Sequence, residues 1–98
     1  MFGLFKAGPA DAFGKELAAF FMERFKALEN TTPKKHAEKV SDILSKMALK
    51  VDKFKQENKP GIMQKAKLAN SFRWALHEQG LEKAQLEELV SWLTRKMG

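Results

Sequence analysis

The sequence predicts an all-α protein that folds as a compact antiparallel four-helix bundle with no β-sheet. Proline and glycine fall at only a few places, and the segments between them have the apolar periodicity and composition of helices. No stretch alternates apolar and polar residues over the length of a strand. Because the connections are short, consecutive helices should be antiparallel neighbours. Three long helices with a shorter fourth are a variant of the same architecture.

The chain of 98 residues is expected to form one domain, with helices at about residues 9–29, 32–57, 60–79 and 82–97. Residues 1–8 are expected to be a flexible segment. The apolar residues Met1–Phe5 could dock on the bundle, remain mobile or insert into a membrane interface. Three large apolar side chains are only a marginal anchor, which argues against membrane attachment.

The first two helices each have a wide apolar face. In the first, the core positions are Phe13, Leu17, Phe20, Phe21, Phe25 and Leu28. Thr32 is a natural N-cap for the second helix, with Pro33 at its first position. The second helix is expected to bury Val40, Ile43, Leu44, Met47, Val51 and Phe54.

The third and fourth helices are joined at Gly80. The third is expected to bury Ile62, Ala66, Ala69, Phe72 and Leu76. Gly80 is expected in the left-handed conformation, with Leu76 and Leu81 as the apolar pair of a Schellman motif. The fourth helix presents Leu86, Leu89, Val90, Leu93 and Met97 on one side, with Trp92 at the boundary.

The net charge of +6 lies in residues 32–80, because basic and acidic residues balance on either side of that range. A line of lysines runs along one face of the second helix: Lys35, Lys39, Lys46, Lys50 and Lys53. Such a line could bind a nucleic-acid backbone or another polyanion electrostatically, or could simply be a solvated face. The chain has fifteen lysines and only three arginines, which favours binding without base readout.

The start of the second helix carries cations where the helix dipole prefers negative charge. A candidate site for a phosphate or carboxylate is therefore formed by Thr31, Thr32, Lys34, Lys35 and His36. Together with the lysine line, the candidate anion-binding residues are Thr32, Lys34, Lys35, His36, Lys39, Lys46, Lys50 and Lys53. The alternative is a first turn whose lysines reach into solvent.

One face of the third helix does not fit the core pattern. Met63, Lys67, Asn70, Trp74 and His77 share the side opposite its expected apolar line. Tryptophan and methionine are enriched at the centres of protein interfaces, so these residues are the candidate protein interface. The alternative is that this helix is central and covered on both faces. Arg24 also breaks a pattern, because it falls within the apolar face of the first helix, where it could extend to solvent near the helix end or pair with a carboxylate from a neighbouring helix.

No catalytic, cofactor-binding or metal-binding motif is found, and no pair of residues is spaced as a nucleophile and its base. The chain has no cysteine, which suits a reducing compartment, and its amino terminus lacks the pattern of a signal peptide. We therefore expect a cytoplasmic protein that is not an enzyme and has no cofactor. The first hypothesis is a protein–protein interaction module. The alternatives are a polyanion binder and, more weakly, a peripheral membrane protein anchored by its apolar amino terminus.

Overall fold

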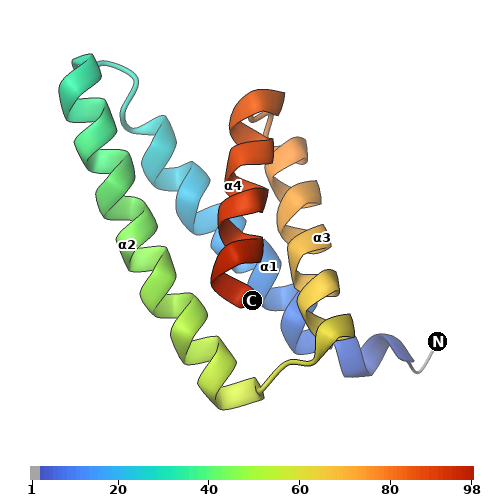
Figure 1. Cartoon of the computed structure of the whole chain (residues 1–98). Coiled ribbons are helices and arrows are strands. Elements are labelled where there is room, and N and C mark those ends of the chain that lie inside the picture. The colour runs from blue at the N-terminus through green and yellow to red at the C-terminus, as the bar shows by residue number, and fades with distance from the viewer. Residues whose placement is uncertain (1–2) are drawn as a thin grey trace.

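A computed structural model describes residues 3–98, with side chains described from Gly8 onward. These residues form four helices and no strand: α1 (Gly3–Lys26), α2 (Pro33–Asn58), α3 (Ile62–Glu78) and α4 (Lys83–Met97). The predicted all-α four-helix bundle is thus confirmed. Helices that follow each other in the chain run in opposite directions (Figure 1).

The bounds of α1 differ most from the expected ones. The helix starts at Gly3, so it includes most of the segment expected to be flexible, and Pro9 lies inside it. A proline removes one backbone hydrogen bond but need not end a helix when neighbouring residues pack well. Ala10, the next residue, is completely buried. The side chains of Met1–Phe5, for which docking, mobility or membrane insertion was considered, lie outside the described residues.

The helix ends follow the predicted local chemistry. The Thr32 hydroxyl accepts a hydrogen bond from the Lys35 backbone N–H at 3.3 Å, which makes it the N-cap of α2. Gly80 has a φ of +87°, and the N–H of Leu81 donates to the carbonyl of Leu76 at 3.2 Å. These are the features of a Schellman motif, so the predicted stop of α3 is confirmed.

The most extensive contact between helices joins α1 to α3, which run in the same direction (Figure 1). Gly14 allows it, because a Cβ atom at this position would lie 2.6 Å from the Leu68 carbonyl oxygen. The α1 backbone therefore lies directly against the α3 backbone, as only glycine permits. Beside Gly14, the Ser71 hydroxyl donates a hydrogen bond to the carboxylate of Asp11.

This contact corrects the predicted buried face of α3. Phe72 and Leu76 are fully buried as expected, but Ile62 is 85% exposed and Ala66 is also exposed. Leu68 and Ser71 are buried in their place. The close approach at Gly14 sets the rotation of α3, and this turns the line through Leu68 and Phe72 toward α1.

Most of the other predicted core positions are buried, but six of them are only half-buried: Phe13, Phe20, Phe25, Val40, Leu44 and Val90. Side chains from all four helices form one buried cluster, and the predicted lines of α2 and α4 supply most of their share. α2 packs against α1 and α4 but not against α3 within the described residues, and its contact with α4 is the least extensive in the bundle. Phe13 of α1 stacks on Phe54 of α2, with ring centroids 4.5 Å apart.

Candidate functional site

The outer face of α3 carries an exposed tryptophan. Trp74 is 56% exposed, and Met63, on the same face near the start of the helix, is 82% exposed. Lys67 is half-buried, whereas Asn70 and His77 are exposed. The His77 ring meets the Trp74 ring edge-on, with centroids 5.7 Å apart. Four of the five candidate interface residues are therefore exposed, and the fifth, Lys67, is half-buried.

Trp74 stands between two hollows in the surface. The larger, of about 510 Å³, lies between α3 and α4, and its lining includes His77, Leu81 and Leu86. The smaller, of about 280 Å³, lies between α1 and α3, and its lining includes Lys67 and Asn70. An exposed indole with a hollow on each side can be buried by a partner, and the partner's side chains can fill the two hollows.

Two polar contacts hold α3 in place around Trp74. Arg73 donates to both carboxylate oxygens of Glu87 on α4, at 2.6 and 2.9 Å. These hydrogen bonds lower the pKa of Glu87 and raise that of Arg73. On the α1 side, hydrogen bonds from Ser71 and then Lys15 lower the pKa of Asp11. The helix is therefore pinned to both neighbours within one turn of the tryptophan.

The lysine line of α2 lies on the surface. Lys35, Lys39, Lys46 and Lys53 are exposed. Two of the lysines have carboxylate partners one turn away, Lys46 with Asp42 at 3.3 Å and Lys53 with Glu57 at 4.0 Å. No such ion pair is found for Lys35, Lys39 or Lys50 within the described residues, and two of these three lysines lie in the first two turns of the helix.

Two cationic side chains, one from α1 and one from α2, lie over the ring of Phe20. The Arg24 guanidinium lies 3.7 Å from the centroid of the Phe20 ring, and the Lys50 ammonium lies 4.9 Å from it. Arg24 also donates to the Phe20 carbonyl at 3.3 Å and pairs with Glu23 at 3.2 Å. The stem of Arg24 thus covers apolar surface while its charge remains at the edge, the first of the two arrangements expected for it.

At the start of α2, the candidate anion-binding groups have different surroundings. Lys34 and Lys35 are exposed, while the Thr32 hydroxyl is occupied as the helix cap. His36 is half-buried, with its ring edge-on to Phe25 at 5.4 Å. The two lysines therefore remain open to an anion, whereas His36 packs toward the core.

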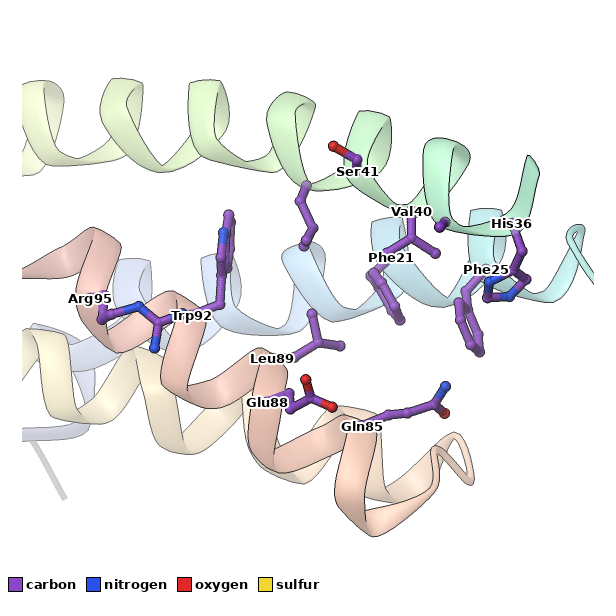
Figure 2. Close-up of a pocket in the computed structure, with 12 residues that line it drawn as sticks. Phe21, Phe25, His36, Val40, Ser41, Gln85, Glu88, Leu89, Trp92 and Arg95 are labelled. Atoms are coloured by element: carbon purple, nitrogen blue, oxygen red, sulfur yellow. The ribbon is translucent and has the colours of Figure 1, made fainter. Parts of the chain in front are cut away.

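A groove between α2 and α4, with α1 as its floor, was not found by the sequence analysis. It has a volume of about 490 Å³. Figure 2 shows Phe21, Phe25 and Leu89 directed into it, with Trp92 and Arg95 toward one end and His36 toward the other. Val40 and Leu44 were assigned to the core and are only half-buried because they line this groove. The one hint of this groove in the sequence was Trp92, a large apolar residue at the boundary of the apolar face of the fourth helix.

The described residues contain no group of three or more histidine, cysteine, aspartate or glutamate side chains placed to hold a metal ion. None of their helices has the length and apolar character needed to cross a membrane.

The protein is a small basic four-helix bundle that exposes Trp74 on the outer face of α3 and a line of lysines on α2. Comparison of the chain with protein-family models, curated proteins and solved structures finds no match. Because a bundle can serve many functions, the function has to be argued from these surfaces.

Proposed function

We propose that this protein is a non-enzymatic interaction module that binds a protein partner through the outer face of α3. The exposure of Trp74 between two hollows carries the proposal. Burying a tryptophan contributes more than burying almost any other side chain, and tryptophan is enriched among the residues that dominate binding energy. With no cysteine in the chain, the proposal is for a protein of the reducing cytoplasm.

The contacts that hold α3 against its neighbours near Trp74 support this role. Two residues that precede Trp74 within one helical turn, Ser71 and Arg73, bond to α1 and α4 respectively. The backbone at Trp74 is thereby held before a partner arrives, so little conformational entropy is lost on binding.

The test compares Trp74→Ala with Leu49→Ala, which removes another exposed apolar side chain, on α2. Proteins captured from a lysate at moderate salt by the immobilised parent are identified, purified and measured by calorimetry. We expect a partner whose affinity falls at least tenfold with Trp74→Ala and is unchanged with Leu49→Ala. Both variants should keep the parent's helical circular dichroism. If every captured protein binds Trp74→Ala as tightly as the parent, the proposal is wrong.

A second candidate function is sequence-independent binding of nucleic acid or another polyanion by α2. The exposed Lys35 and Lys39, which have no ion pair within the described residues, favour it. A short mixed-sequence DNA duplex titrated into the labelled protein should shift amide signals within residues 32–53, and the shifts should weaken steeply toward physiological salt. Replacing Lys34 and Lys35 with glutamate should remove them. Unchanged shifts in that double variant, or no shifts at low salt, would exclude this function.

A further inference from the structure

The two most exposed of the large apolar side chains among the described residues are neighbours. Ile62 is 85% exposed and Met63 is 82% exposed, compared with 70% for Leu49 and 56% for Trp74. They form the first turn of α3, directly after the connection from α2. Gly61, just before them, has no atom within 4 Å of the position where its Cβ would lie. The pair therefore projects from the end of the bundle.

The surroundings of this pair are cationic. Between Glu57 and Glu78 the sequence has no acidic residue, and it has Lys59, Lys65, Lys67 and Arg73. The charge of Arg73 is matched by Glu87 in an ion pair, which leaves the three lysines nearest to Ile62 and Met63. Asp11 interacts with Lys67, but its carboxylate is already held by Ser71 and Lys15. What remains is a pair of exposed apolar side chains with three lysines, Lys59, Lys65 and Lys67, within five residues of them in the sequence.

The beginning of α1 lies at the same end of the molecule. Pro9 lines a small hollow together with Asn58, Lys59, Pro60 and Gln64, which places it beside the α2–α3 connection (Figure 1). Ile62 and Met63 therefore lie at the end of the molecule where Pro9 of α1 meets the α2–α3 connection.

We propose that this end of the bundle binds peripherally to the surface of an anionic lipid bilayer. Ile62 and Met63 enter the boundary between headgroups and acyl chains, and Lys59, Lys65 and Lys67 contact lipid phosphates and carboxylates. A projecting apolar tip with basic residues around it suits a soft, negatively charged surface. Met63 and Lys67 also belong to the proposed protein-binding face, but the hollows that suit a protein partner lie beside Trp74, whereas Ile62 and Lys59 lie outside that face. This inference therefore does not depend on the proposed protein-binding role.

The test is flotation of the full chain with vesicles, near physiological salt. One set is phosphatidylcholine alone, and the other contains about one third phosphatidylserine. We expect binding to the anionic vesicles to be at least about tenfold stronger than to the neutral ones. The double variant Ile62→Asn, Met63→Asn should reduce it about tenfold or more, because both apolar contacts are lost. Since both side chains are exposed, this variant should fold like the parent, which circular dichroism checks.

Matched variants separate this surface from the others. Leu49→Asn and Trp74→Ala should bind anionic vesicles like the parent, whereas the triple variant Lys59→Gln, Lys65→Gln, Lys67→Gln should bind weakly. The inference is overturned if the parent does not float with anionic vesicles. It is also overturned if the Ile62, Met63 double variant floats equally well, since charge alone then accounts for adsorption. If that double variant instead loses a captured protein while vesicle binding is absent, the tip is a protein contact.

Discussion

At Gly14 a single hydrogen in place of a methyl group determines how closely two helices approach. A Cβ there would lie 2.6 Å from the Leu68 carbonyl oxygen, 3.0 Å from the Ser71 Cβ and 3.1 Å from the Phe72 nitrogen. Two of these three are backbone atoms, so no change of side-chain rotamer can relieve the overlap. The residue therefore decides the spacing of α1 and α3, and with it the orientation of the tryptophan face.

We predict that Gly14→Ala lowers the free energy of unfolding by about 1–3 kcal/mol, the usual cost of overpacking. At an exposed helix position the same change would raise the free energy of unfolding by up to about 1 kcal/mol. The sign of the change in unfolding free energy therefore tells whether Gly14 is at a close helix contact. Urea denaturation measures this change. Gly61→Ala is the matched control, because no atom lies within 4 Å of its Cβ position, and it should change stability by less than about 1 kcal/mol. A Gly14→Ala protein as stable as the parent would show that α1 and α3 do not approach this closely.

The pairing of helices α3 and α4 depends on pH through one ion pair. Hydrogen bonds from Arg73 lower the pKa of Glu87 below its value in the unfolded chain. The pair therefore stabilises the fold fully above roughly pH 4 and loses its contribution as the pH falls through the lower pKa of the folded state.

Glu87→Gln should lower the melting temperature near neutral pH and leave it close to the parent's at about pH 2, where both proteins lack the carboxylate charge. Thermal unfolding followed by circular dichroism across this range provides the measurement. Glu88→Gln removes the same charge one residue later, at a side chain for which no ion pair is found within the described residues, so it should follow the parent more closely. A Glu87→Gln deficit that is independent of pH would contradict an electrostatic origin.

Across the whole molecule, packing is uneven. The α1–α3 contact is the most extensive and the α2–α4 contact the least, and α2 makes no contact with α3 within the described residues. The groove of about 490 Å³ lies where α2 and α4 diverge. Lys55 donates to the carbonyl of Lys96 at 3.0 Å, but that bond is exposed and contributes little. α2 is therefore the helix that can separate from the bundle at the lowest free energy.

Native-state hydrogen exchange should show this difference. We expect amides around Met47 and Val51 in α2 to open at a lower free energy than those around Leu68 and Phe72 in α3. These four side chains are all completely buried, so the comparison is free of differences in local exposure. Equal opening free energies in the two helices, at the value for global unfolding, would mean that the bundle unfolds as one cooperative unit.

Most of the helices could be derived from the sequence because their signals are local. Thr32 and Pro33 start α2, and Gly80 with Leu81 ends α3, through hydrogen bonds that span only a few residues. The start of α1 at Gly3 could not be derived from the sequence. Gly8 followed by Pro9 normally marks a helix boundary, so the helix was expected to begin only at about residue 9. The place of Trp74 opposite Phe72 and Leu76 marked it as a candidate interface residue, but a helix covered on both faces was the alternative, and only the tertiary structure decided that Trp74 is 56% exposed.

The sequence alone determined the fold class, the principal core lines and the concentration of positive charge in residues 32–80, because each depends on composition or helical periodicity. Tertiary structure decided which residues of α3 are buried, since Gly14 brings Leu68 against α1 and leaves Ile62 exposed. It also decided that α1 packs on α3 and that a groove opens between α2 and α4. These are relations between distant segments, and they follow from how backbones and side chains fit together in space.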